Sequence, residues 1–292
     1  MIDNSLVAAR ALVYGTLLMA AGLPIYLLTA GLAAGVTKGV RSALAGLALG
    51  GVAASIWWAL ASVAAMAAQP IIALDQPMIT AVLEATPLGL ILAVRLPALV
   101  ILILTALLPL DPRIRLPLAA LCGSIALATC AFSGHAGATE GSIGAVHRLA
   151  DVIHLIAAGT WAAALVVLLT TVIKRVSAQQ LVRQLSHFAT TGTVIVAALM
   201  LTGAINTLAI LGWPLPPEVY ASLWGKVLLI KLGAFAAMLG LAALNRWRLT
   251  PALAADDVGA GGRLRRSLVA ETGLALGIMA LVAALGLLDP AG

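Results

Sequence analysis

The hydrophobic and polar positions of this chain fall into long blocks. Apolar stretches of 18 residues or more recur from one end to the other, separated by short segments rich in Gly, Pro and charge. About 20 apolar residues in a helix cross the hydrocarbon core of a bilayer, so each block predicts a transmembrane helix. The expected spans lie near residues 6–30, 42–68, 88–109, 115–133, 145–173, 187–212, 222–245 and 266–288.

This pattern predicts an all-α fold, a polytopic membrane bundle of about eight helices. None of the blocks alternates with the period of two that membrane-spanning strands show. Residues 1–292 contain no internal repeat and no polar segment long enough for a second domain, so we expect a single transmembrane domain. The 69–87 connection is longer than the others and is expected to hold a short interfacial helix. The N-terminus lacks a basic leader and cleavage site, so the first apolar block should remain as a helix.

Composition agrees with a lipid environment. The chain is 62% hydrophobic and 10% charged, whereas a soluble domain has about 25% charged residues, and its mean hydropathy is +1.11. The net charge of +6 could suggest nucleic acid as a partner. The basic residues lie mainly in the connections between spans, where they orient a membrane protein, so we expect the lipid bilayer and no nucleic acid.

The distribution of Lys and Arg predicts the orientation. Three connections, 69–87, 134–144 and 213–221, contain no Lys or Arg, whereas the alternate connections carry 12 of the 17. Basic loops stay in the cytoplasm, so the three connections without Lys or Arg and both termini should face outward, toward the periplasm in a bacterium with two membranes. The basic loop residues are Lys38, Arg41, Arg113, Arg115, Lys174, Arg175, Arg183, Arg246, Arg248, Arg263, Arg265 and Arg266.

One segment concentrates the polar chemistry. Residues 133–161, SGHAGATEGSIGAVHRLADVIHLIAAGTW, hold three of the four histidines. His147, Asp151 and His154 are spaced i, i+4 and i+7, so they share one face of the fifth span. Ionisable residues inside a membrane are costly and mark functional sites. Imidazole and carboxylate groups suit a divalent transition metal, and Cu(II) stands near the top of the affinity order.

The spacing leaves the number of metal sites open. His147 and His154 lie about 10 Å apart along a straight helix, too far to share one ion. His135, in the Gly-flanked turn after the fourth span, could fold over the fifth span and complete a three-ligand site. The alternative is two adjacent sites with Asp151 between them. A third alternative is structural, in which Arg148 pairs with Asp151 and no metal binds.

Basic residues inside the spans argue against a simple cation pathway. Arg95, Arg148, Lys226 and Lys231 outnumber the acidic residues of the spans, Asp151 and Glu271. These cations could meet the propionates of a haem. A haem-binding membrane redox protein, with His147 or His154 as axial ligand, is therefore an alternative hypothesis.

Several motifs resemble a known family. "TPLG" followed by Arg95, "SGHA" at 133–136, and the pattern "H…D..H…A..W" from His147 to Trp161 are similar to signatures of the bacterial copper-resistance D family (CopD, with the related PcoD). The segments 223–251 and 264–273 are similar to its last two helices. The resemblance covers essentially the whole chain. It implies eight spans in the inner membrane and copper binding by His135, His147 and His154, with Asp151 as a ligand or as a partner of a ligand.

The resulting hypothesis is a copper-binding protein of the inner membrane with no enzymatic activity. Copper would leave the periplasm, bind His135 and His147, and pass through Asp151 to His154 toward the cytoplasm. Cu(II) is favoured by these ligands, and Cu(I) is also possible. The resemblance implies a separate periplasmic CopC-like copper protein as a partner. Besides the haem protein, the open alternative is a copper-delivery or assembly factor that transports nothing. The chain has no GxxxxGK[ST] motif, which disfavours a primary pump.

Overall fold

A computed structural model describes residues 4–32, 36–174 and 176–289. In this part of the chain all regular structure is helical, and eight helices are long and apolar enough to cross a membrane, as the sequence predicts. The basic loop residue Arg175 lies outside the described residues. The spans are α1 (Asn4–Thr29), α2 (Lys38–Ala67), α4 (Pro87–Leu107), α5 (Pro112–Ala128) with the 3-10 turn Thr129–Phe132, α7 (Gly141–Ile173), α8 (Ala178–Leu211), α9 (Leu223–Leu244) and α11 (Ala260–Leu285).

Shorter helices lie in the connections. The 69–87 connection contains the predicted short helix, α3 (Gln76–Ala85), which begins at an Asp75 cap. The turn between α5 and α7 contains α6 (Gly134–Ala138). Beyond α9 the helix continues through a π-helical turn, Asn245–Leu249, into α10 (Thr250–Ala254). A segment expected to be a basic loop is thus largely helical.

The helix ends differ most from the prediction at α8. This helix begins at Ala178, where the Ser177 hydroxyl caps the Gln180 amide, whereas the sequence predicts a start near residue 187. Its first turns, AQQLVRQLSH, are polar but contain good helix formers. Hydropathy marks the part of a helix inside the hydrocarbon, so it misses helical turns that extend into water.

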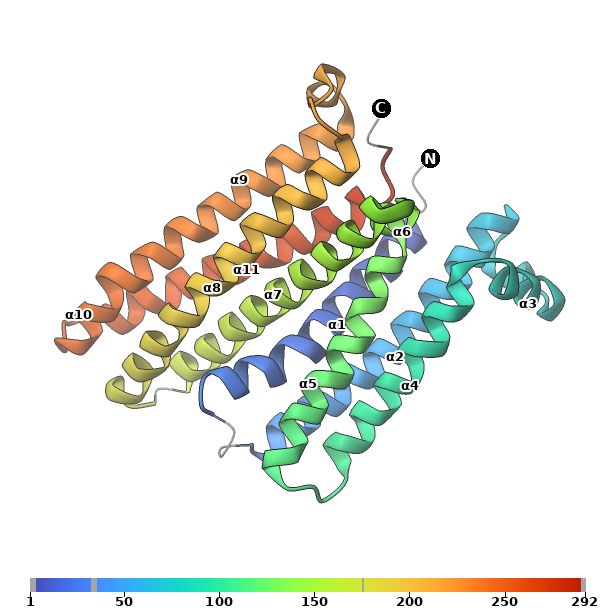
Figure 1. The fold of residues 1–292 in the computed structure, drawn as a ribbon. Coiled ribbons are helices and arrows are strands. Elements are labelled where there is room, and N and C mark those ends of the chain that lie inside the picture. Colours follow the sequence, from blue (N-terminus) through green and yellow to red (C-terminus); the bar gives the residue numbers. More distant parts are fainter. Residues whose placement is uncertain (1–3, 33–35, 175, 290–292) are drawn as a thin grey trace.

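Helix α1 is the centre of the amino-terminal part of the bundle and packs against α2, α5 and α7 (Figure 1). Glycines permit these contacts. A Cβ atom on Gly22 would lie 2.0 Å from the Gly159 carbonyl oxygen of α7, and one on Gly123 would lie 2.5 Å from the Ala20 oxygen. Small residues let membrane helices approach backbone to backbone. The close contact fixes α7 against α1.

The other helices form a looser layer beside α7. Helix α8 packs on α7, and α11 packs on α9, α7 and α1. Both chain termini lie at one end of the molecule, together with α6 and the α8–α9 connection (Figure 1). We call this the terminal end. The opposite end, which carries the predicted basic loops, is the basic end.

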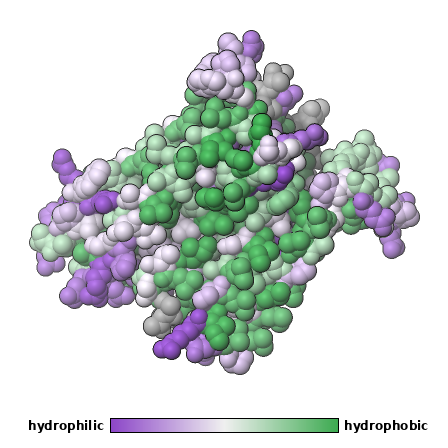
Figure 2. Space-filling view, viewed as in Figure 1, coloured by the Kyte–Doolittle hydropathy of each residue, from purple (hydrophilic) through white to green (hydrophobic). Residues whose placement is uncertain are grey.

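The surface fits a lipid environment. Figure 2 shows hydrophobic residues over the middle of the visible face, with hydrophilic residues gathered toward the extremities. Large apolar side chains are exposed on most spans, which would be unfavourable in water but not in lipid. Examples are Leu49, Leu90, Leu107, Val194, Leu201 and Ile230.

Candidate functional site

The three polar residues predicted on one helix face lie within α7, in the half near the terminal end. We call His147, Asp151 and His154 the histidine stripe. His147 is only 2% exposed, and Asp151 and His154 are partly buried. Each of the three has a hydrogen-bond partner outside α7, so the stripe is integrated into the bundle.

His147 is held by a threonine in the turn before α7. Its Nδ1 lies 2.9 Å from the Thr139 hydroxyl oxygen. The same hydroxyl donates its hydrogen to the His135 carbonyl at 2.9 Å. A hydroxyl has one hydrogen to donate, so Thr139 accepts from the ring and Nδ1 carries the proton.

His154 has the same arrangement with a different helix. Its Nδ1 lies 2.9 Å from the Thr202 hydroxyl of α8, and that hydroxyl donates to the Ala198 carbonyl at 2.5 Å. The ring therefore donates toward α8, and Nδ1 again carries the proton.

This tautomer has a chemical consequence. In a neutral imidazole with its hydrogen on Nδ1, the lone pair belongs to Nε2. Histidines that bind metal commonly donate their other ring N–H to a neighbouring acceptor, which fixes the tautomer and the ring orientation. The two threonines supply this support, so His147 and His154 are both arranged to offer Nε2 to an ion.

Asp151 lies between the two histidines and is engaged from α8 and α9. Its Oδ1 accepts a hydrogen bond of 3.2 Å from the Asn206 amide, and Lys231 of α9 attracts it electrostatically. The Arg148 side chain contacts other groups than Asp151. It donates to the Thr139 carbonyl at 3.1 Å and lies over the Phe132 ring at 5.9 Å.

His135 points away from the stripe. Its ring packs edge-on against Trp224, and its Nε2 donates to the Leu285 carbonyl at 3.2 Å. Its backbone nevertheless joins the same network, because its carbonyl accepts from Thr139, the partner of His147. Among the described residues, no three His, Cys, Asp or Glu side chains come close enough to hold one ion together. The structure thus brings His135 near the stripe through its backbone and places its side chain against α9 and α11.

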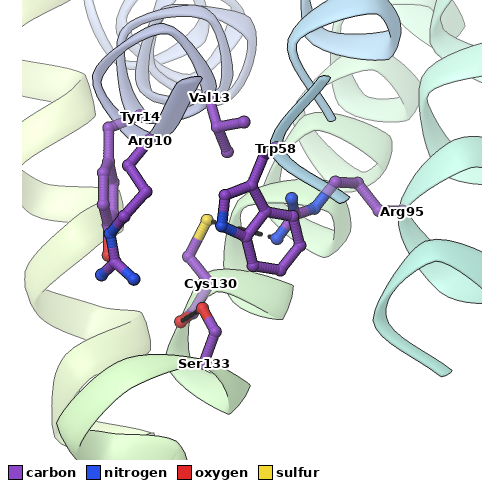
Figure 3. Close-up of a pocket in the computed structure, with 7 residues that line it drawn as sticks. All are labelled: Arg10, Val13, Tyr14, Trp58, Arg95, Cys130 and Ser133. Carbon is purple, nitrogen blue, oxygen red and sulfur yellow. Dashed lines mark hydrogen bonds between the residues drawn. The ribbon is translucent and has the colours of Figure 1, made fainter. Parts of the chain in front are cut away.

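A second polar cluster lies on the other side of α1 and was only partly foreseen. Arg95 of α4 donates from Nε to Thr129 at 2.7 Å and from Nη2 to the Cys130 sulfur at 3.6 Å, and it lies over the Trp58 ring at 4.9 Å. Arg10 of α1 lines the same pocket (Figure 3). We call this cluster the arginine pocket; its lining is Arg10, Val13, Tyr14, Trp58, Arg95, Cys130 and Ser133.

Sequence reasoning missed four of the residues that complete these sites. Thr202 and Asn206 are polar residues spaced i, i+4 in an apolar helix, and that pattern is a signal that could have been used. Arg10 resembles an ordinary cation near the start of a helix. Thr139 lies in a turn, and no sequence pattern connects it with His147.

The fold and site together define a polytopic helical membrane protein. Residues 182–285 match the family model described as copper resistance protein D, and residues 1–145 match the model described as copper resistance protein D-like, N-terminal domain. The chain therefore belongs to the copper resistance protein D family. Most of α7, with Asp151 and His154, lies between the two matched regions.

Two curated relatives agree with this family. Copper resistance protein D of Pseudomonas syringae pv. tomato is 39% identical over 189 residues, which are 61% of each chain. Inner membrane protein YebZ of Escherichia coli is 32% identical over 126 residues, 42% of each chain. The matches thus span less than two thirds of either relative. No solved structure is a significant match.

Proposed function

We propose that this protein binds copper at the histidine stripe and transfers it across the inner membrane toward the cytoplasm. The observation that carries the proposal is the paired arrangement of His147 and His154, each of which donates Nδ1–H to a threonine and keeps Nε2 for an ion. The family name supports copper as the cargo, and the name of the E. coli relative supports the inner membrane.

The stripe supports transfer better than storage. His147 and His154 lie about 10 Å apart along α7, and Asp151 lies between them. At each step of the transfer, the ion would be held by two neighbouring ligands only. Such weak coordination suits an ion that has to be released again. His135 would take part at the terminal end, after its ring turns away from Leu285. The histidine and carboxylate ligands favour Cu(II), and a pair of histidines also accepts Cu(I).

The direction and the partner belong to the same proposal. If the basic end faces the cytoplasm, as the Lys and Arg distribution predicts, the terminal end with His135 and His147 faces the periplasm. A separate CopC-like copper protein would deliver copper there. The activity we propose is binding and transport, with no chemical conversion.

Transport into liposomes tests the proposal. Purified protein is reconstituted into liposomes that enclose a copper-sensitive dye, and the initial rate of copper entry is measured. We expect entry with the wild type and loss of entry in His154→Ala. His187→Ala is the matched control, because His187 is an exposed histidine of α8 outside the stripe. Copper binding without entry in the wild type would contradict transport and favour a delivery or assembly factor.

A further inference from the structure

The arginine pocket contains two buried cations whose N–H donors are not all used. Arg95 is 1% exposed and Arg10 is 8% exposed. Nη1 of Arg95 and Nε of Arg10 are buried and have no hydrogen-bond partner among the described residues. Buried polar groups are almost always satisfied, so two unpaired guanidinium nitrogens on residues that line one pocket indicate a missing acceptor.

None of the described residues that line the pocket is acidic. Among the described residues, the recorded ion pair joins Arg263 to Asp257 at the surface. Of the described carboxylates, Asp151 acts electrostatically on two pocket residues, Tyr14 and Cys130. Asp151 is already hydrogen-bonded to Asn206 and attracted by Lys231. Two buried cations without a counter-charge are costly, and a bound anion would remove that cost.

The cavity by itself holds at most one water-sized ligand, but it lies beside a larger space. Its volume is about 10 Å³, close to the minimum for one water-sized ligand. Beside it lies a larger groove of about 410 Å³ between α1, α2, α4 and the Phe132–Gly134 turn, lined in part by the same Arg10, Trp58 and Ser133. Figure 3 shows Arg10 and Arg95 entering from different helices, with Trp58, Cys130 and Ser133 between them in this view.

We propose that the arginine pocket binds a small monovalent anion of halide size, such as chloride. Nε of Arg10 and Nη1 of Arg95 donate to it, and the groove is its entry path from the terminal end. Arg95 is pre-positioned by Thr129, Cys130 and Trp58, so binding requires little rearrangement of this side chain. A halide ion is larger than water, so it would lie where the cavity meets the groove, a place that Arg10, Trp58 and Ser133 line on both sides. A phosphate group is larger still and fits only the groove. The proposal does not depend on the copper assignment.

Halide quenching of Trp58 fluorescence tests this site. Iodide quenches tryptophan on contact, and Trp58 lies in the pocket. Detergent-purified protein without copper, in gluconate buffer, is titrated with iodide at constant ionic strength. We expect a saturable quenching component in the wild type that chloride removes competitively, and loss of that component in Trp58→Phe. This comparison uses no arginine variant, so it does not depend on whether such a variant folds.

Arginine variants and a control locate the anion. Arg95→Gln should lose the saturable component, whereas Lys226→Gln should keep it, because Lys226 is an exposed cation near the start of α9. Chloride should also raise the unfolding midpoint of the wild type by about 2–5 °C at saturation. Linear quenching, equal in the wild type and Trp58→Phe, would overturn the proposal. Competition by anionic lipid but not by chloride would also overturn it and assign the groove to a headgroup phosphate.

Discussion

The histidine stripe and the arginine pocket are both polar clusters inside an apolar bundle, but the stripe offers free hydrogen-bond acceptors and the pocket offers free donors. In the stripe, the ring N–H groups of His147 and His154 meet acceptors and leave nitrogen lone pairs available. In the pocket, Arg10 and Arg95 have more donors than their neighbours accept. One cluster is suited to a cation and the other to an anion.

The difference shows how one bundle can keep basic residues beside a cation site. Helix α1 carries Arg10 and Tyr14 toward the pocket and packs directly on α7, which carries the stripe. The clusters therefore lie on neighbouring helices, and Asp151 of the stripe acts electrostatically on Tyr14 and Cys130 of the pocket. Arg95 is occupied by Thr129, Cys130 and Trp58 within its own pocket. The excess of cations over carboxylates in the spans therefore does not by itself exclude a copper pathway.

The largest expected effect is disruption of both clusters at once. In Gly22→Ala the new Cβ would meet the Gly159 carbonyl, so α1 and α7 must separate. We expect a loss of roughly 3 kcal/mol or more in the free energy of unfolding, with loss of both copper and halide binding. Gly46→Ala is the control, because a Cβ there meets nothing within 4 Å. Equal stability of the two variants would show that the helix contact does not hold the clusters together.

Substitution of the threonine partners should affect the histidine stripe without affecting the arginine pocket. Thr202→Val or Thr139→Val removes the acceptor of a histidine N–H while keeping the shape of the side chain. Copper affinity, measured by competition with a chelator, should fall about 10–100-fold, and halide quenching should not change. Thr207→Val is the control, since the Thr207 hydroxyl bonds only its own helix at Gly203. An unchanged copper affinity in both variants would argue against the proposed tautomers.

Acidification should weaken copper binding at the histidine stripe and leave halide binding in the arginine pocket unchanged. A protonated imidazole has no lone pair, so copper binding should weaken once the pH falls below the pKa of the ligating histidines, by about tenfold per pH unit for each histidine ligand. Protonation of Asp151 would act in the same direction. Arginine stays charged, so halide quenching should persist between pH 7.5 and 5.5. Copper affinity that stays constant down to the lowest pH at which the protein remains folded would contradict histidine ligation.

Arg148 should have the smallest effect. It supports the turn beside His147 through the Thr139 carbonyl and the Phe132 ring, and it does not pair with Asp151 in this structure. Arg148→Gln should weaken copper binding by roughly two- to fivefold, consistent with a partly exposed cation–π contact. A much larger loss would indicate that the arginine acts on Asp151 after all.

The sequence was sufficient to predict the spans and the shared helix face of the stripe residues, because both depend on local patterns. Eight apolar blocks predict eight helices without knowledge of their packing, and the i, i+4, i+7 spacing alone places three residues on one face of α7. The predicted start of α8 was wrong because polar helical turns precede the apolar block.

The partners of the site could not be read from the sequence, because they depend on tertiary contacts. Thr202 reaches His154 only when α7 and α8 pack in one register. In one of the two arrangements considered from the sequence, His135 folds over α7, whereas in the structure its ring contacts Trp224 of α9 and the Leu285 carbonyl of α11. Arg10 joins Arg95 only after α1 and α4 assemble around Trp58.

The most direct test of the central claim is the metal content and absorption spectrum of detergent-purified protein. Wild type, His147→Ala, His154→Ala and the double variant are compared with the His187→Ala control. The account predicts stoichiometric copper in the wild type and control, reduced copper in the single variants, background copper in the double variant, and no Soret band. Copper retained by the double variant would contradict the stripe as the binding site, and a Soret band lost with either histidine would identify a haem protein instead.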